Sequence, residues 1–504
     1  MSASSVAAPR ESASPSKAWV RSLFSFPAMC MVLLAAVIFG LCVKQFAEPD
    51  IWWHLRSAQD LWQTHNFTPA DTYSFTAAGS QRLNYEWLSE LGYFFAYRLA
   101  GLRGILGLYF GLLVLTFSGV YYLCCTAGAD GIDSVLAVFL GILLAAVSIG
   151  PRTLLFGWLC MVAILAILDR FRRTARGLWL MPAVFALWIN LHPSWVFGLA
   201  VVVMTIACGL VEGTWGQVRA VKWTPAQLRT LLLTTAASVA ALLVNPLGYK
   251  LALYPFDFLF RQQSNVSYIA EWQSVDFSSG DGKVALLSII GLMAVALVSR
   301  RRWRLEEVVL TAFALWMALS HTRFLFFAGL ILPPIFAQRI NLFQPYRPDE
   351  DKPLLNAAIM GCILAGILVF FPSQASLQTK VDEEYPTAAL KFMRENQLTG
   401  RTFNQYFWGG YMEWTIPELK TFVDGRADIF VYNGVLDAHR KATGIQQPLE
   451  VMDTYKIDYA LLQPGSPLAY LMQHAAGWRQ IYSDKVAVLI GRKSTRSFAN
   501  GNAN

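Results

Sequence analysis

Residues 23–55 read LFSFPAMCMVLLAAVIFGLCVKQFAEPDIWWHL, an apolar run followed by acidic and aromatic residues. A helix needs about 20 apolar residues to cross a bilayer, and residues 23–43 supply them. This run is too long for the apolar core of a signal peptide, and no small-residue cleavage site stands out. The stretch therefore predicts a retained membrane helix that leads into a polar loop.

The whole chain of 504 residues shares this apolar character. Hydrophobic residues make up 55% of it and charged residues only 15%, whereas roughly 25% charged residues is usual for a soluble protein. This composition excludes a soluble enzyme and a disordered chain. The formal net charge of +8 does not indicate nucleic acid binding, because the basic residues cluster between apolar runs, as the orientation signals of membrane proteins do.

Apolar runs recur along most of the chain and predict about eleven membrane helices. They lie at about 23–43, 104–125, 133–149, 153–169, 178–191, 194–213, 229–245, 283–299, 305–320, 323–338 and 354–372. Residues 87–100 are nearly apolar enough for a twelfth span, but Glu90 and Arg98 favour a helix that lies in the membrane interface. A twelfth span there would invert the orientation of everything that follows.

The charges of the loops predict which side is which. Three loops are rich in arginine and lysine, at 169–176, 219–229 and 300–304, whereas the long loops at 44–103 and 246–282 carry at least as many acids as bases. Since cytoplasmic loops are enriched in basic residues, we expect a cytoplasmic N-terminal tail at residues 1–22. Both long loops then lie on the outer side.

Residues 373–504 are mixed in composition and contain no further run of membrane length, which predicts a separate soluble α/β domain on the outer side. The expected elements are helices at 387–396 and 435–443, strands at 421–424 and 458–462, and a hairpin at 481–491. The sequence as a whole thus predicts a mainly α fold. A polytopic membrane domain spans residues 23–372, includes outer loop 44–103, and precedes the soluble domain.

Ionisable residues are costly in a membrane protein and mark functional sites. Here they gather at the outer side. In the first outer loop, Ile51, Leu55, Ala58 and Trp62 recur at helical spacing, and Asp50 and His54, four residues apart, share another face. The loop predicts an interfacial helix that presents a carboxylate and an imidazole together. The alternative is that Asp50 only caps this helix and His54 only anchors it.

Other polar residues fall near the same surface. Asp71 and Glu86 lie in the first outer loop, although Asp71 is equally ordinary turn chemistry and Glu86 equally suits a helix cap. Predicted outer ends of later spans carry Arg152, Asn190, His192, His321 and Arg323. Each has a structural explanation alone, but together they suit an anionic, lipid-linked substrate. Arginine and histidine would hold phosphate oxygens, and a carboxylate would act as a general base.

The predicted soluble domain contains one dense group of polar and aromatic residues. Its members are Asn404, Trp408, Tyr411, Asp424, Arg426 and Asp428. Aromatic rings beside carboxylates suit saccharide binding. The alternative is that the neighbouring glycines make tight turns and that Asp424 merely pairs with Arg426.

The chain resembles membrane glycosyltransferases of the GT-C fold, and in particular a group of largely uncharacterised bacterial membrane proteins placed with them. The resemblance covers most of the chain. Its motifs are Glu48-Pro49-Asp50, Asp50-Ile51-Trp52-Trp53-His54-Leu55, Asp71-Thr72-Tyr73-Ser74-Phe75-Thr76, Trp408-Gly409-Gly410-Tyr411 and Val423-Asp424-Gly425-Arg426-Ala427-Asp428.

The resemblance implies that a sugar is moved from a polyprenyl-phosphate donor to a lipid, glycan or protein acceptor on the outer face of the bacterial inner membrane. Asp50, with Glu48, then activates the acceptor hydroxyl or helps to hold a divalent cation, Mg²⁺ or Mn²⁺, whose use varies within the fold. The competing hypothesis is a transporter or a non-catalytic assembly component of envelope polysaccharide. That hypothesis expects ionisable residues deep in the spans or an internal repeat, and the sequence shows neither.

Overall fold

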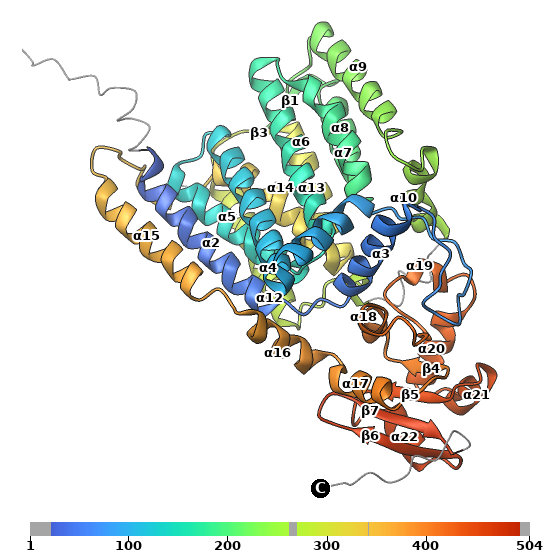
Figure 1. Cartoon of the computed structure of the whole chain (residues 1–504). Coiled ribbons are helices and arrows are strands. Elements are labelled where there is room, and N and C mark those ends of the chain that lie inside the picture. Colours follow the sequence, from blue (N-terminus) through green and yellow to red (C-terminus); the bar gives the residue numbers. More distant parts are fainter. Residues whose placement is uncertain (1–21, 262–269, 341, 494–504) are drawn as a thin grey trace, which may run out of the picture.

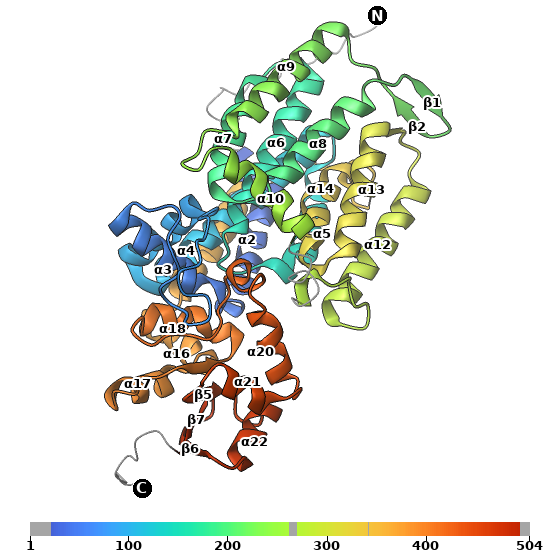
Figure 2. The ribbon, with the colours of Figure 1, turned by 90° about the vertical axis from the view of Figure 1, so that its right-hand side faces the viewer.

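The computed structural model describes residues 22–261, 270–340 and 342–493, so nearly all of the predicted cytoplasmic tail at 1–22 lies outside the described residues. Apolar helices form one body, and the C-terminal region, orange to red, lies against one end of it beside α3 (Asp50–Thr64) (Figure 1). The view at right angles shows the same arrangement (Figure 2).

Every predicted membrane run lies on a helix. The apolar body contains α2 (Phe26–Lys44), α4 (Trp87–Thr126), α5 (Gly131–Ala145), α6 (Leu154–Thr174), α7 (Met181–Leu191), α8 (Trp195–Cys208), α9 (Pro225–Ala241), α10 (Tyr249–Arg261), α12 (Gly280–Val298), α13 (Leu305–Ser320), α14 (Leu325–Ala337) and α15 (Pro353–Val369). By length and composition, α2, α4, α5 with its extension to Ser148, α6 and α12 are long enough to cross a membrane. Helix α15 and α16 (Gln374–Glu384), bent by 61°, make a sixth span if they count as one.

Five or six helices of the described residues are thus long and apolar enough to cross a membrane, and the remaining expected spans are shorter helices. Helices α7, α8 and α14 are apolar but only 11 to 14 residues long. Helix α7 ends at Leu191, as expected, two residues before Pro193. Helix α9 ends at Ala241, four residues before the end of the predicted run at 229–245.

Helix α4 joins the predicted interfacial helix to the second span across a break. The backbone is not helical at Ala100 and Gly101, and Gly101 has a φ of +59°, a conformation that glycine adopts without steric cost. The segment before the break is thus a separate helical piece, as expected. Its residue Glu90, however, is fully buried and does not face an interface.

The apolar helices run between two polar ends. At one end the basic loops meet: Arg172 forms an ion pair of 2.6 Å with Glu306, and β2 (Val218–Ala220) pairs with β1 (Gly213–Trp215) and β3 (Trp303–Arg304). The other end carries α3, the start of α4 and the polar ends of α7 and α13. The basic loops share one end, as the charge pattern predicts. Which end faces the cytoplasm stays a prediction.

The C-terminal region continues with a four-stranded sheet in the order β4-β5-β7-β6 and short helices around it. Only the β4–β5 pair is parallel. The elements are α17 (Thr387–Glu395), β4 (Thr402–Asn404), α18 (Gly409–Thr415), α19 (Ala427–Phe430), α20 (Val435–Thr443), α21 (Pro448–Thr454), β5 (Tyr459–Leu462), α22 (Pro467–His474), β6 (Trp478–Ser483) and β7 (Val488–Arg492). The helices expected at 387–396 and 435–443, the strand at 458–462 and the final hairpin are present.

The strand expected at 421–424 is wrong. Thr421 makes only isolated bridges, to Ser74 and to Thr402. Beyond it, the Asn404 side chain replaces a neighbouring strand, because its Oδ1 accepts from the Phe422 N–H and its Nδ2 donates to the Val423 carbonyl. These backbone groups are satisfied without a ladder.

The C-terminal region packs closely on the first outer loop. The Trp52 ring on α3 contacts the rings of Tyr385 and Tyr411, with centroids 5.7 and 4.9 Å away. Gly425 approaches α3 so closely that an added Cβ would lie 2.3 Å from Asp50 Oδ1 and 2.6 Å from Trp53 Nε1. Residues far apart in the sequence thus share one tightly packed interface.

Gly425→Ala is expected to loosen this interface and to destabilise the protein by about 1–3 kcal/mol, the usual cost of overpacking. The Asp50 side chain can rotate away from the new methyl group, but the rigid Trp53 ring cannot yield without moving α3. Thermal unfolding in detergent measures the effect. Gly361→Ala is the matched control, since nothing lies within 4 Å of its added Cβ. Equal melting temperatures for the two variants would contradict the close packing.

Candidate functional site

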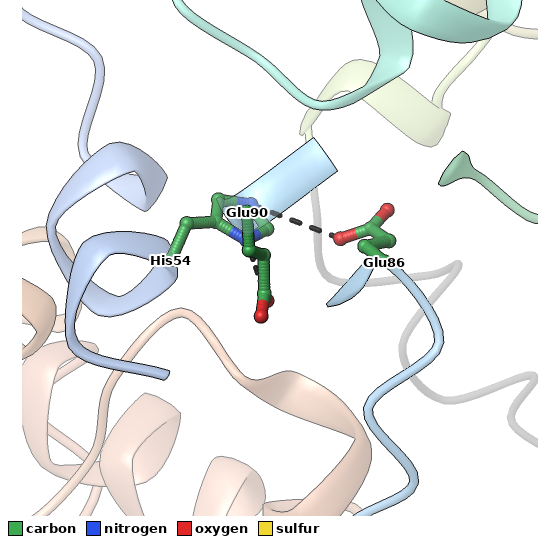
Figure 3. Close-up of side chains that lie close together, drawn as sticks. All are labelled: His54, Glu86 and Glu90. Carbon is green, nitrogen blue, oxygen red and sulfur yellow. Dashed lines mark hydrogen bonds and ion pairs between the residues drawn. The ribbon is translucent and has the colours of Figure 1, made fainter. Parts of the chain in front are cut away.

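The first outer loop brings three buried side chains together (Figure 3). His54 projects from α3, whereas Glu86 and Glu90 lie one turn apart at the start of α4. The His54 Nδ1 lies 3.0 Å from Glu90 Oε1, and its Nε2 lies 3.8 Å from Glu86 Oε2. Ile51, Leu55 and Ala58, which alternate with these polar positions on α3, are buried in the apolar core and hold the imidazole in place.

His192, at the end of α7, extends this group beyond Glu86. Its Nε2 lies 3.2 Å from Glu86 Oε1, and its Nδ1 accepts the backbone N–H of Ser194. Since Nδ1 accepts, the neutral ring carries its proton on Nε2 and donates it to Glu86. Asn190 has a structural place: its side chain bonds Trp87 Nε1 and the carbonyls of Ala186 and Val244.

Arg82 and Asn84 extend the group beyond Glu90. Asn84 Nδ2 donates to Glu90 Oε2 over 2.9 Å. The Arg82 guanidinium lies 3.8 Å from Glu90 and 3.9 Å from Asp428. Asp428, predicted from the C-terminal motif, therefore does reach the polar residues of the first outer loop. We call His54, Glu86, Glu90, His192, Asn84 and Arg82 the polar cluster.

A second group, the arginine arm, consists of Glu48, Arg152, Glu271 and Arg323. Arg152 donates to Glu48 over 2.8 Å and to both oxygens of Glu271 over 2.6 and 2.9 Å. Arg323 approaches Glu271 only to 3.8 Å, above the ring of Trp272. The two predicted arginines are thus close together, but each nitrogen of Arg152 already donates to a carboxylate.

The electrostatics differ between the two groups. Burial raises the pKa of Glu86 to about 7, although the nearby His54 lowers it. In the arginine arm, burial also acts to raise the pKa of Glu271, but the Arg152 guanidinium holds that pKa below its usual value. The arginine arm is therefore a balanced set of ion pairs, whereas none of the arginines whose side chains the structure describes forms an ion pair with Glu86.

Asp50 and His54 do not form the expected pair. Among the described residues, Asp50 Oδ1 accepts from Trp53 Nε1 over 3.1 Å and lies against Gly425, whereas His54 faces the two glutamates. The Trp53 ring stacks on His54 at 3.6 Å between centroids. Four-residue spacing places the two side chains on one face of α3, but each binds a different neighbour.

The remaining predicted residues hold the C-terminal region in place. Arg426 contacts Asp71, Asp424 and Glu413 over 2.7 to 2.9 Å. Asp71 also accepts from Ser74, as turn chemistry predicts. Trp408 Nε1 donates to the Glu384 carbonyl and the Tyr411 hydroxyl bonds Thr387. The pairing of Asp424 with Arg426 that we considered as the alternative is therefore present.

Sequence reasoning missed several residues of the site. Glu90 pairs with His54, a contact that the sequence does not indicate. No motif predicts the other four missed residues, which are Arg82, Asn84, Glu271 and Glu413. The i,i+4 spacing of Glu86 and Glu90 is the one local signal that could have indicated a shared face.

Comparison with known proteins gives one structural neighbour to report. No family model and no curated protein matches the chain. A cryo-EM structure of a mutant of arabinofuranosyltransferase AftD from Mycobacteria is similar at a TM-score of 0.48 and 13% sequence identity, covering 91% of this chain and 41% of that chain. This chain spans about two fifths of the length of that protein, so the activity of the latter is not carried over.

Proposed function

We propose that this chain is a membrane glycosyltransferase that moves a sugar from a polyprenyl-phosphate-linked donor to an acceptor of the cell envelope. The observation that supports this best is the convergence of the polar cluster and the arginine arm at one end of the apolar helices. Buried acids, histidines and arginines at this position suit a substrate with an anionic head and an apolar tail.

Asp50 is the proposed general base. Trp53 holds its Oδ1, which leaves Oδ2 to accept the proton of an acceptor hydroxyl. The acceptor oxygen then bonds to the anomeric carbon as the bond from that carbon to the phosphate oxygen breaks, and polyprenyl phosphate leaves. One base suffices for this inverting displacement, since the phosphate is a good leaving group. The side chain is only half-buried, so an acceptor can reach it.

Arg323 and His321 are the proposed phosphate ligands. The Arg323 side chain is 26% exposed and holds Glu271 only loosely. His321 has a buried Nδ1 that lacks a hydrogen-bond partner within the described part of the chain. Arg152, which pairs with Glu48 and Glu271, is instead a positioning residue in this scheme. Arg152 bonds Glu48 Oε2 and Trp53 bonds Asp50 Oδ1, so the divalent cation that the resemblance left open would bind through Glu48 Oε1 and Asp50 Oδ2.

The acceptor, whether lipid, glycan or protein, would reach Asp50 through the exposed part of this side chain, because Gly425 packs against its Oδ1 and closes that side. We assign the protein to a bacterial inner membrane with this region on the outer side. This assignment follows the predicted orientation of the basic loops.

The proposal is tested by mass spectrometry of polyprenyl-linked sugars and surface glycans from cells that lack the protein. We expect a donor to accumulate, or a glycan to lose one sugar, and the wild-type gene to restore the profile. The sugar is identified by the same spectra. Unchanged profiles would contradict transfer and favour the transporter or assembly hypothesis.

A further inference from the structure

The carboxylates of Glu86 and Glu90 lie around His54 at distances that also suit the ligands of a metal ion. One ligand atom from each of His54, Glu86 and Glu90 lies within 4.8 Å of the other two. The three residues are 3%, 6% and 0% exposed. Two carboxylates thus converge on one imidazole in a place that water hardly reaches.

The outer oxygens of both glutamates are held by hydrogen-bond donors. His192 Nε2 holds Glu86 Oε1, and Asn84 Nδ2 holds Glu90 Oε2. The other two oxygens, Glu86 Oε2 and Glu90 Oε1, are the ones that face His54. Ligands of metal ions are commonly oriented in this way, by donors that bond the atoms not used by the ion.

Local charge and an unpaired carbonyl oxygen also indicate a ligand. Among the described residues, the Arg82 guanidinium approaches Glu90 only to 3.8 Å, is shared with Asp428, and has two buried nitrogens, Nε and Nη2, without a hydrogen-bond partner. The Asn84 Oδ1 is buried and has no hydrogen-bond partner within the described residues. A buried carbonyl oxygen without a donor is costly, and a water molecule on a bound ion would supply one.

We propose that His54, Glu86 and Glu90 bind one divalent transition-metal ion, with Zn²⁺ as the best match. Zinc takes nitrogen and carboxylate ligands at bonds of about 2.0–2.2 Å, and imidazole favours it over Mg²⁺ and Ca²⁺. A tetrahedral shell places ligand atoms about 3.4 Å apart. His54 Nδ1 and Glu90 Oε1 lie 3.0 Å apart, and the ligand atoms of the three residues all lie within 4.8 Å of one another, so side-chain adjustments alone would form the shell. The fourth position would hold water. This inference does not depend on the proposed sugar transfer.

Metal content of the full-length protein in detergent tests the proposal. After removal of metal with EDTA, incubation with Zn²⁺ and dialysis, mass spectrometry of the elements should find about one Zn²⁺ per wild-type chain. Glu86→Gln and Glu90→Gln should each lose the ion. Asn84→Ala should weaken the affinity about 10-fold. Glu306→Gln, which makes the same change in an ion pair with Arg172, should keep the ion.

Two results would overturn the proposal: a wild-type protein that retains no Zn²⁺, or glutamine variants that retain as much as Glu306→Gln. Elution as the same monodisperse peak shows that a variant is folded. Should Glu86→Gln and Glu90→Gln fail that check, Co²⁺ loaded into the wild type decides, since a site with nitrogen and oxygen ligands gives visible absorption. A wild-type protein without that absorption contradicts the site. Neither measurement uses sugar transfer, so the two proposals fail separately.

Discussion

Asp50→Asn is expected to lower the rate of sugar transfer by about 10²–10⁴-fold, the usual contribution of a general base. The amide oxygen can still accept the bond from Trp53 Nε1, so the start of α3 keeps its structure. The amide cannot take a proton from the acceptor hydroxyl. Cells that carry only this variant should therefore show the same glycan profile as cells without the protein, while expression and melting temperature barely change.

The matched control for this variant is Asp60→Asn on the same helix. Asp60 accepts a hydrogen bond from the Tyr73 hydroxyl and pairs with Arg56. These contacts stabilise the first outer loop and take no part in the proposed reaction. We expect it to restore the profile. If Asp50→Asn restored the profile as well, Asp50 would not be the base.

Arg426→Met is expected to have the largest effect on stability, about 3–5 kcal/mol of unfolding free energy, since it leaves buried carboxylates without their cation. Arg426 is buried among Asp71, Asp424 and Glu413. Although burial acts in the opposite direction, the guanidinium holds the pKa of Asp424 below its usual value. Burial raises the pKa of Glu413 despite the same guanidinium. The loss should appear as a lower melting temperature in detergent.

Arg347→Met provides the comparison for Arg426→Met. Arg347 and its partner Glu350 have side chains that are 66% and 68% exposed, and ion pairs of this kind contribute about 0–1 kcal/mol. A melting temperature of Arg426→Met as high as that of Arg347→Met would show that the three carboxylates adapt without the cation. The C-terminal region would then be held mainly by the rings around Trp52.

Helices could be predicted from the sequence more reliably than strands. Apolar runs identify helices because burial in lipid or core needs a long apolar surface, and each run lies on one. The segment 421–424 has strand composition, but the Asn404 side chain takes the place of a neighbouring strand. A substitution of that kind leaves no pattern in the sequence.

In the candidate site, too, the sequence indicated a region but not the contacts within it. Polar residues at predicted outer ends of spans did indicate a common region, since Glu86 meets both His54 and His192. Their partners could not be predicted. Arg152 and Glu271 bond across 119 positions of the sequence, and neither spacing nor composition encodes such a contact. The burial of Glu90 could not be predicted for the same reason, because it depends on where α3 packs.

The interface between the first outer loop and the C-terminal region also constrains how the protein is made. Thr76 bonds the Phe422 carbonyl across 346 positions, and Arg426 reaches Asp71 over a similar span of sequence. At a synthesis rate of about 5–20 residues per second, the loop waits about 17–70 s for its partner to leave the ribosome. Asp71 is therefore translated early but receives its partner late, which leaves a newly inserted chain without this interface until residues 422–426 have been made.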